Sequence, residues 1–455
     1  MSLMGALGAA TSGLDSIAKQ LAVVSQNVAN AGTPGYVRES APAVDAGQSG
    51  VALGVRTGIA VRNLDETLQT QLLASSADVA GQGVKSTALA VLDAASGTPG
   101  SGYDLPGLLG GLRDGFSTLA SDPANSTLQN QVITAADGLA RGVNALGNAI
   151  TNARQTAQDG IVTGVATANA ALRSVGALSD QIIAAQARGV STAGLEDARD
   201  QQVQVVSNLT GARFLRQSNG DMLAVAHGVT LPLRGASGPL AVLTAVLAAD
   251  TPLIALPLVT IGGQDVTGAL TGGQIGANLA LRDKVLPSVQ AGLDAVAYTL
   301  ASGFAGAGLP LFTNAVAVVP AGPTVGFAQG IQVSAAVRAA PTMLRDGIAP
   351  AGPAGSTALI NAVLGSVLAS GGGSVAAQAS SLTAGIAQSA SQASSTLDAD
   401  KAAQSSLQTR LAADSGVSVD NELATMVQLQ GAYAANAKVL SATNSMWQAL
   451  LDIVR

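Results

Sequence analysis

The sequence predicts a mainly α-helical protein with smaller β parts, in which the two ends of the chain pair as a coiled coil. Apolar residues recur in a four-three rhythm at both ends, which is the period of a helix that packs along another helix. A helical period also continues through some sixty residues of the middle, and it gives way to strand-like patterns between residues 211 and 274. These observations predict a long helical-bundle middle domain that carries one or more outer β domains.

The last stretch of the chain, residues 419–454, has the most regular pattern. Its seam positions are Val419, Leu423, Met426, Gln430, Tyr433, Ala437, Leu440, Asn444, Trp447, Leu451 and Val454. Nine of these eleven residues are apolar, so the pattern predicts a helix that packs over about five heptads. Asp420 and Glu422 fall in its first turn, where negative charge stabilises a helix N-terminus.

The start of the chain has a matching seam. Its positions are Leu3, Leu7, Ala10, Leu14, Ile17, Leu21, Val24 and Val28. The two terminal helices are therefore expected to lie side by side. One interpretation is an ordinary intramolecular pair. The other is a pair that becomes fully ordered only when neighbouring copies pack around it. Only Asp15 and Lys19 are charged between Leu3 and Val28, and this low charge favours the second interpretation.

Further elements follow in chain order. A proline-glycine turn at residues 33–36 reads as type II, after a helix that ends near Asn30 with Gly32 as its C-cap. Asn63 and Glu66 form a capping-box-like start for a helix to about residue 92. Helices are predicted at 105–119, 128–182, 195–209, 275–300 and 375–411. The second of these, if it has no break at Asp159-Gly160, would be roughly 90 Å long. A β-hairpin is expected where a turn at 218–221 separates two short apolar runs.

The predicted domain organisation has four parts. Residues 1–62 and 412–455 form a terminal coiled-coil domain with an extended segment. Residues 63–210, 275–305 and 375–411 form a rod-like helical domain, and residues 211–274 form a small β domain. Residues 306–374 are a glycine- and proline-rich outer segment with β or irregular structure.

Composition excludes several classes of function. The chain carries a net charge of −6 without a basic tract, which argues against a nucleic-acid partner. No cysteine and one histidine are present, so thiolate and histidine-cluster metal sites are excluded. The best membrane-span candidate, residues 240–261, is interrupted by Asp250, Pro252 and Pro257, and no membrane role is expected. A Sec-type signal peptide is not expected either.

No catalytic, cofactor or metal site is predicted. His227 reads as a polar residue at a strand edge. Glu196, Asp197, Arg199 and Asp200 cluster on a predicted helix, and such clusters are typical of a solvated face with i,i+4 pairs. The glycine pairs at 262–263 and 272–273 lack the lysine of a phosphate-binding loop. An enzyme, or a secreted helical effector, is therefore the least favoured alternative.

Two motifs resemble those of a known family. The run SQNVANAGTPGYVR at residues 25–38 resembles the N-terminal motif of bacterial flagellar axial proteins, the rod, hook and hook-associated family. The runs SGVSVDNEL at 415–423 and QGAYAANAKVL at 430–440 resemble its C-terminal motif. Mapped onto this sequence, the family motif residues are Asn27, Asn30, Thr33, Gly35, Tyr36, Arg38 and Asn436.

The middle of the chain is similar to the hook-associated branch of this family. The run GLEDARDQQV at residues 194–203 precedes the predicted hairpin, as a comparable helix precedes a β domain in that branch, although the commoner form of the run differs. Rod and hook proteins are mostly β in their centres, so the long helical middle argues against them. Another axial protein, a rod or hook subunit, remains the main alternative.

The resemblance implies a structural role. A hook-associated junction protein would form a ring of like subunits by helical self-assembly, between hook protein and a second junction protein, hook-associated protein 3. It would be exported unfolded by the flagellar type III apparatus with an export chaperone, and would lie outside the cell as part of the flagellum. Cysteine absence and the lack of a cleaved signal peptide agree with that route.

Overall fold

The computed structural model describes residues 3–45, 54–98, 100–234, 238–349, 352–371 and 373–453. Val454, the last position of the predicted C-terminal seam, lies outside them. The fold is mainly helical with short strands, as the sequence predicts. The chain divides into two compact units. Unit 1 comprises Met1–Ala77, Thr167–Pro239 and Lys401–Arg455, and unit 2 comprises Asp78–Ala166 and Leu240–Asp400.

Unit 1 holds both terminal helices and most of the strands that follow them. Its elements are α1 (Leu3–Asn30), β1 (Glu39–Ser40), β2 (Ala43–Asp45), β3 (Val55–Thr57), β4 (Val61–Arg62), the first part of α2 (Glu66–Ser96), the last part of α4 (Ser126–Ala187), α5 (Ala193–Thr210), β5 (Arg213–Arg216), β6 (Met222–Ala226), β7 (Val229–Leu231), the end of α12 (Val375–Ser415) and α13 (Val419–Ile453).

Unit 2 holds the remainder of α2, α4 and α12 together with the shorter helices. Its other elements are α3 (Leu105–Leu119), β8 (Leu240–Ala241), η2 (Leu253–Ala255), β9 (Thr260–Ile261), β10 (Gln264–Asp265), η3 (Thr267–Ala269), α6 (Gly273–Ala280), η4 (Leu281–Val285), α7 (Leu286–Gly306), β11 (Phe312–Thr313), α8 (Phe327–Gly330), β12 (Gln332–Val333), α9 (Ala335–Ala339), α10 (Met343–Asp346) and α11 (Ala358–Ser366).

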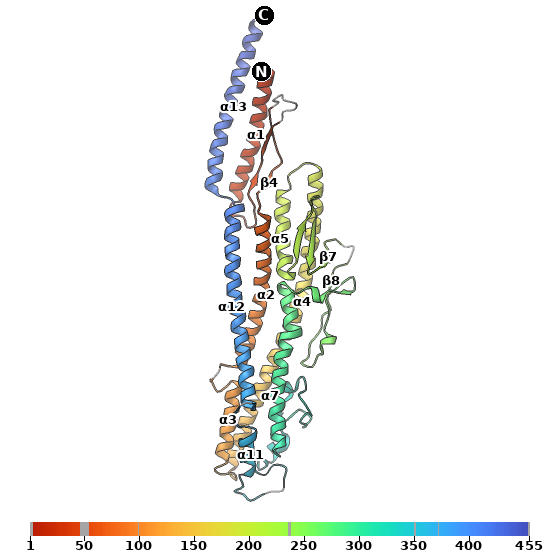
Figure 1. The fold of residues 1–455 in the computed structure, drawn as a ribbon, viewed down its shortest axis with the longest axis vertical. Helices are drawn as coiled ribbons and strands as arrows, with labels where there is room; N and C mark the ends of the chain where they lie inside the picture. Colours follow the sequence, from red (N-terminus) through yellow and green to blue (C-terminus); the bar gives the residue numbers. More distant parts are fainter. Residues whose placement is uncertain are drawn as a thin grey trace. The chain divides into compact units, whose positions relative to one another are not determined.

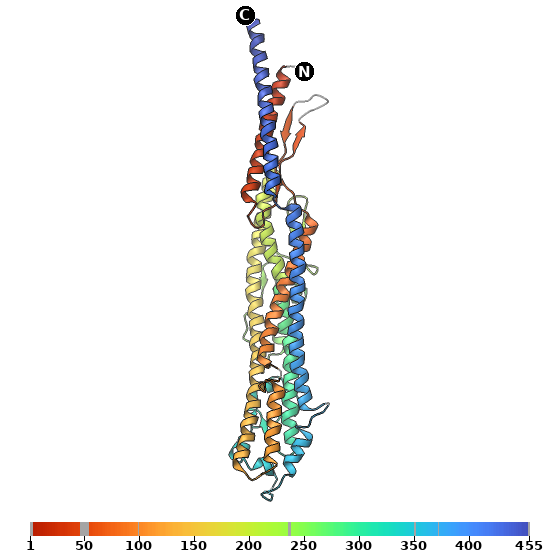
Figure 2. The ribbon, with the colours of Figure 1, turned by 90° about the vertical axis from the view of Figure 1, so that its left-hand side faces the viewer.

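The terminal helices α1 and α13 lie side by side, as predicted (Figures 1 and 2). Every α1 seam position is at least half-buried. The face that α13 turns toward the interior differs from the prediction in part. It includes the predicted seam residues Met426, Ala437 and Leu440, together with Glu422, Leu429, Asn436 and Thr443, each one residue before a seam position, whereas the seam residue Leu423 is 46% exposed. One residue corresponds to about 100° around a helix, so much of the predicted apolar seam stays in solvent.

The connection after α1 follows the predicted turn, but two predicted caps are wrong. The backbone N–H of Tyr36 donates to the Thr33 carbonyl at 3.2 Å, and Gly35 has φ of +80°, as a type II turn requires. Gly32 does not take the left-handed conformation of a glycine C-cap. At α2 the cap is Asp65, not Asn63, because its Oδ1 accepts from the backbone N–H groups of Thr67 and Leu68.

The helix α4 runs unbroken for 62 residues, so Asp159-Gly160 does not interrupt it. Within the described residues, α4 is the one helix whose length and composition would suit a membrane span. However, 44% of its most apolar window is buried inside the protein, as expected of a core helix. Its heptad-like positions Leu139, Val143, Leu146 and Ile150 are all 1% exposed or less.

The β regions are small and antiparallel. The predicted hairpin forms, with Arg213 opposite Val225 and Arg216 opposite Met222, and β7 adds a third strand. Residues 211–274, expected as one β domain, contain two separate three-stranded sheets, β5-β6-β7 and β8-β9-β10, which fall in different units. The four-part domain division therefore stays a prediction, and its β part is not a single sheet.

The core of unit 2 is aromatic at its centre and has a π-helical turn at one side. Phe304 lies 5.8 Å from Phe116 and 5.5 Å from Phe312, measured between ring centroids. The helix predicted from residue 275 is interrupted by the π-turn η4. Arg282 in this turn is 1% exposed and donates to Gln158 Oε1 at 2.6 Å and to the Pro257 carbonyl at 2.9 Å.

Candidate functional site: the junction beneath the terminal helices

The side chain of Asn27 joins the last turn of α1 to the first turn of α13. It is fully buried. Its Nδ2 donates to the Glu39 carbonyl at 2.9 Å and to Glu422 Oε2 at 3.1 Å. Its Oδ1 accepts from the Glu39 backbone N–H at 3.0 Å and from the Tyr36 hydroxyl at 2.9 Å. Both donors and both acceptor positions of the amide are used, so only a carboxamide side chain supplies the hydrogen bonds of this site.

Glu422 joins this amide to Arg38. Its side chain is 1% exposed, and its Oε1 lies 2.6 Å from Arg38 Nε. The backbone N–H of Arg38 donates to the Ser415 carbonyl at 3.1 Å, and the Ser415 hydroxyl accepts from the Asp65 backbone N–H at 3.2 Å. The N-terminal and C-terminal motifs therefore meet in one hydrogen-bonded junction, which joins α1, the extended segment and both helices that flank residue 416.

The remaining motif residues have structural contacts of their own. Asn30 Oδ1 accepts from the Thr33 hydroxyl at 3.3 Å, which supports the turn at the end of α1. A side chain at Gly35 would be strained, and its Cβ would lie 3.4 Å from Gln201 Nε2. Asn436 packs against Gly13, where a Cβ would come within 3.3 Å of the Asn436 Oδ1. The absence of a side chain at Gly13 lets the two terminal helices approach closely.

A second cluster ties the extended segment to α5. Arg62, whose side chain is 3% exposed, lies 2.8 Å from Asp197 Oδ1 and 2.7 Å from Asp200 Oδ2. It also contacts Glu196 Oε2 at 3.4 Å. The prediction that residues 196–200 form a solvated face is wrong, because Asp197 is 8% and Arg199 2% exposed. Arg62, the partner of the carboxylates in this run, is more than a hundred residues away in sequence, so i,i+4 spacing could not reveal it.

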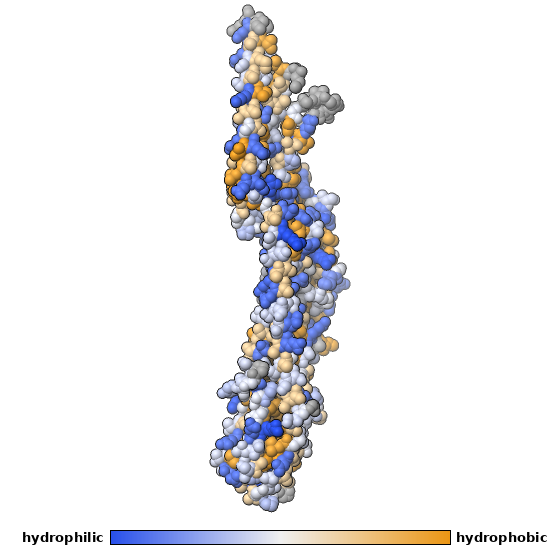
Figure 3. Space-filling view, turned by 60° about the vertical axis from the view of Figure 1, so that its left-hand side comes forward, coloured by the Kyte–Doolittle hydropathy of each residue, from blue (hydrophilic) through white to orange (hydrophobic). Residues whose placement is uncertain are grey.

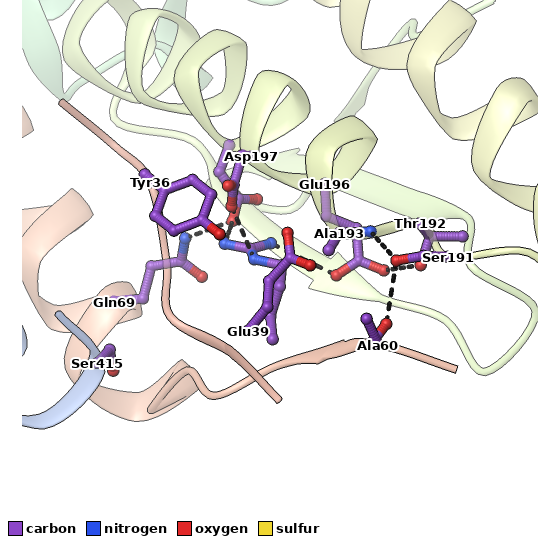
Figure 4. Close-up of polar contacts among 12 residues, drawn as sticks. Tyr36, Glu39, Ala60, Gln69, Ser191, Thr192, Ala193, Glu196, Asp197 and Ser415 are labelled. Carbon is purple, nitrogen blue, oxygen red and sulfur yellow. Dashed lines mark hydrogen bonds and ion pairs between the residues drawn. The ribbon is translucent and has the colours of Figure 1, made fainter. Parts of the chain in front are cut away.

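Further polar contacts around the start of α5 extend the cluster (Figure 4). Arg216 lies 3.1 Å from Asp200 Oδ2 and donates to Gln69 Oε1 at 2.9 Å. The Ser191 hydroxyl donates to the Ala60 carbonyl at 3.0 Å, and the Thr192 hydroxyl donates to Glu196 Oε1 at 2.7 Å. The strand β4 is therefore held to the start of α5 by backbone, hydroxyl and ionic contacts.

Burial decides the titration of this cluster. Burial raises the pKa of Asp197, and Arg62 partly opposes it. Burial, followed by the charge of Asp197, raises the pKa of Glu39. Burial by itself would lower the pKa of Arg62, but Asp200 and the other carboxylates outweigh it and raise that pKa. The pKa of the Tyr36 hydroxyl is also raised, first by burial and then by Glu39. The positive charge of Arg62 favours the ionised forms of Asp197 and Glu39.

A cavity of about 380 Å³ adjoins both clusters within unit 1. Its lining contains both polar and aliphatic residues. The lining residues are Ala31, Gly35, Tyr36, Val37, Arg62, Leu64, Gln69, Leu72, Leu73, Asp197, Asp200, Gln201, Gln204, Gln408, Leu411, Ala412, Ser415, Gly416 and Val417. In the part of the chain that the structure describes, no group of His, Asp or Glu side chains has a metal-binding arrangement. His227 is an exposed turn residue with φ of +42°.

The structure brings the predicted motif residues together around Asn27, whereas Asn436 lies further along α13. Sequence reasoning missed three residues of this junction: Glu39, Glu422 and Arg62. Glu422 was interpreted only as a helix-start charge. Its position one residue before an apolar seam residue could have suggested a buried acid, and an arginine in the opposite motif is its natural partner.

Comparison with known proteins supports the terminal motifs and the helical middle separately. A family model described as the flagellar hook-associated protein FlgK helical domain matches residues 93–306. A model of the flagella basal body rod protein matches residues 7–36, and one of the flagellar basal body rod FlgEFG protein C-terminal region matches residues 410–453. The rod models cover only the ends, whereas the middle matches the hook-associated model.

The helical middle of the chain therefore matches flagellar hook-associated proteins of the FlgK type, and both ends match flagellar rod proteins. The predicted family is thereby confirmed, and its hook-associated branch is favoured over rod and hook subunits. The search of solved structures finds the flagellar hook junction protein FlgK from Burkholderia pseudomallei, 24% identical with a TM-score of 0.45, which covers 56% of this chain. This chain covers 46% of that protein, about half its length. The comparison with curated proteins finds no match.

Replacing Asn27 with Asp should loosen the terminal pair of this FlgK-like chain. The substitution places a carboxylate next to the buried Glu422 and removes two donors. An unsatisfied or repelled buried group costs about 1–3 kcal/mol. Hydrogen exchange at the first turns of α13 should therefore accelerate by roughly tenfold to a hundredfold. The exposed Asn421→Asp variant is the matched control and should exchange at the wild-type rate. Equal rates in Asn27→Asp and wild type would contradict the junction's importance.

Replacing Arg62 with Met should destabilise unit 1 by about 3–5 kcal/mol at neutral pH, because three carboxylates lose their shared cation. Without Arg62 the pKa of Asp197 rises further. A carboxyl group with a raised folded-state pKa favours folding below its unfolded pKa, and this contribution is lost as pH rises through the folded pKa. The deficit relative to wild type should therefore shrink between pH 7 and about pH 4, as thermal unfolding would show.

The control for this prediction is Arg56→Met on strand β3, where the arginine is exposed. It should change the unfolding temperature little at either pH. A deficit in Arg62→Met that is absent, or that grows as pH falls, would argue against the proposed electrostatic role.

Proposed function

We propose that this chain is a structural subunit of the junction between the flagellar hook and filament, built by self-assembly of its terminal helices. The match of the helical middle to the FlgK model supports this role. The observation that carries the assembly mechanism is the exposed apolar surface of α13. Residues on this surface include Val419, Leu423, Val427, Tyr433, Trp447, Leu450 and Leu451, each at least 40% exposed.

Such a surface is unusual for a protein that works as a monomer. Soluble monomers rarely leave long apolar stripes in water. Figure 3 shows apolar side chains gathered along the terminal helices. Because α13 faces α1 with a partly polar set of residues, the seam residues that stay exposed, such as Leu423 and Tyr433, remain available to a neighbouring copy. The exposed seam of α13 is thus proposed to contact neighbouring copies. The α1 seam positions from Leu3 to Val28 would pack against α13 within each copy.

The proposal includes the location and partners that the family implies. The terminal helices would line the inner wall of a tube, and the subunits would form a ring between hook protein and hook-associated protein 3. An export chaperone and the flagellar type III apparatus would deliver the chain outside the cell. Neither nucleic acid nor membrane is part of the proposed role. We also propose that the chain is no enzyme, since its buried polar clusters are occupied by structural hydrogen bonds.

Deletion of the gene in the source bacterium tests the role directly. The expected result is cells that carry bare hooks by electron microscopy and release flagellin into the medium, because filament subunits have no base on which to polymerise. Normal hooks and filaments would overturn the proposal. Loss of the hooks themselves would favour the alternative, a rod or hook subunit, for which the matches at both chain ends are the specific support.

Substitution of exposed seam residues tests the mechanism. Leu423→Asp and Leu451→Asp should abolish filament attachment, because burying each leucine contributes about 1.5–3 kcal/mol per copy and the contact is repeated around a ring. Both leucines are exposed in the single chain, so circular dichroism should show an unchanged fold. Gln428→Asp, on the exposed side of the same helix away from the seam, is the control and should support filaments. Normal filaments in both leucine variants would refute assembly through this seam.

A further inference from the structure

Unit 2 exposes aliphatic side chains from two neighbouring loops. In the loop between β8 and β9, Ile254 is 96% and Val246 94% exposed. The loop that follows β11 exposes Val316, Val318 and Val325. The loops are adjacent, since a Cβ at Gly326 would lie 3.5 Å from the Ala249 Cβ. We call the exposed residues Leu243, Val246, Ile254, Leu258, Val316, Val318 and Val325 the loop patch.

The loop patch is built by a row of polar side chains on α4. Gln155 Nε2 donates to the Ala245 carbonyl at 3.1 Å, and its Oε1 accepts from the Leu247 backbone N–H at 2.8 Å. Gln158 donates to the Leu243 carbonyl at 3.1 Å. Asn144, further along α4, donates to the Ala328 carbonyl at 2.7 Å.

These bonds hold the loop backbones against the helix. The same loop also anchors itself by burying Leu247, Leu256 and Val259. The exposed residues Val246, Ile254 and Leu258 therefore project from a fixed backbone, and they form a surface with a defined shape.

The loop patch carries almost no charge. Residues 240–261 contain one charged residue, Asp250, and residues 307–337 contain none. A contiguous apolar surface of this kind marks an interaction site. Its partner must be uncharged as well, because a charge buried against aliphatic side chains without a counter-ion is costly.

The same unit has an uncharged helix face that matches this requirement. From Val375 to Leu397 the helix α12 has no charged residue. It buries Val375, Ala379, Thr383, Ile386 and Ala393. The opposite side exposes small and amide side chains, and we call this set the α12 face: Ser381, Ala384, Gly385, Gln388, Ser391, Gln392 and Ser395. The serine, alanine and glycine positions of this face allow projecting aliphatic side chains to approach closely.

We propose that the loop patch of one copy docks on the α12 face of a second copy. Within unit 2, α12 and the loop between β8 and β9 lie on opposite sides (Figures 1 and 2). A contact between two different faces is heterologous, so each copy can bind one neighbour through each face and the contact repeats from copy to copy. One chain therefore supplies both uncharged surfaces. The inference rests on the proposed function, because it assigns a lateral contact to the self-assembling subunit.

Cysteine cross-linking tests the contact in the full chain. The natural sequence has no cysteine, so introduced pairs report only themselves. Ile254→Cys combined in turn with Ser381→Cys, Gln388→Cys or Ser395→Cys should give disulfide-linked multimers in isolated flagella for at least one register. Ile254→Cys with Thr134→Cys, an exposed position on α4, is the control and should stay monomeric. Multimers with the control alone, or with none of the four pairs, would overturn the proposal.

Charge complementation distinguishes the occupant. Ile254→Glu should reduce the number of filaments per cell by more than about tenfold, since it buries an unpaired charge. Adding a lysine at the α12 position that cross-links to Ile254 (Ser381→Lys, Gln388→Lys or Ser395→Lys) should restore filaments, whereas a glutamate at that position should not. Unchanged filaments in Ile254→Glu would show that the loop patch contacts no other protein chain. Loss of filaments without rescue by the lysine would show that the loop patch contacts a protein other than a second copy. Either result would overturn the proposal. Neither result affects the gene-deletion test, so failure of this inference is separable from failure of the proposed function.

Discussion

The buried amide of Asn27 is the interaction on which the arrangement of the chain ends depends. It is hydrogen-bonded to the segment that follows α1 and to the start of α13, so it joins parts of the chain almost 400 residues apart in sequence. Glu422 is tolerated in the interior because Asn27 and Arg38 occupy its two oxygens. A buried group of this kind gains little net stability but permits one geometry only. At this end of α13, the seam residue Leu423 is thereby left exposed.

The interior of unit 1 and the interior of unit 2 are stabilised by different forces. Unit 2 closes around three phenylalanines in tilted and edge-to-face contact and a broad aliphatic cluster, and its stabilisation comes mainly from removing apolar area from water. Around the start of α5, unit 1 relies on arginines shared among several carboxylates. Ionic contacts weaken with salt or a change of protonation, whereas apolar burial does not. The two units thus differ in the solution conditions to which they respond.

Sequence periodicity predicted the helices well, because local spacing and burial agree along α1, α3 and α4. The hairpin was also predictable, since its turn chemistry is local. The polar contacts between the end of α12 and the start of α13 could not be predicted from local spacing. The run at residues 196–200 looked solvated because its partner Arg62 is distant in sequence. The buried face of α13 is offset from part of the predicted seam. A count of apolar residues does not include the burial of Glu422 or the close approach of Asn436 to Gly13. In each case a long-range polar contact outweighed the local pattern.

The π-turn η4 has a consequence for how the helices after it are phased. Its i→i+5 bonding accommodates more residues than an α-turn of the same height, so the faces of α7 are rotated relative to those of α6. Leu281 and Arg282, adjacent in sequence, both reach the interior for this reason. Every buried position from Leu286 to Phe304 inherits its orientation from these five residues. An alignment of related chains should therefore allow a one-residue gap at η4. An inserted residue there changes the phase of the helix without adding or removing a helix.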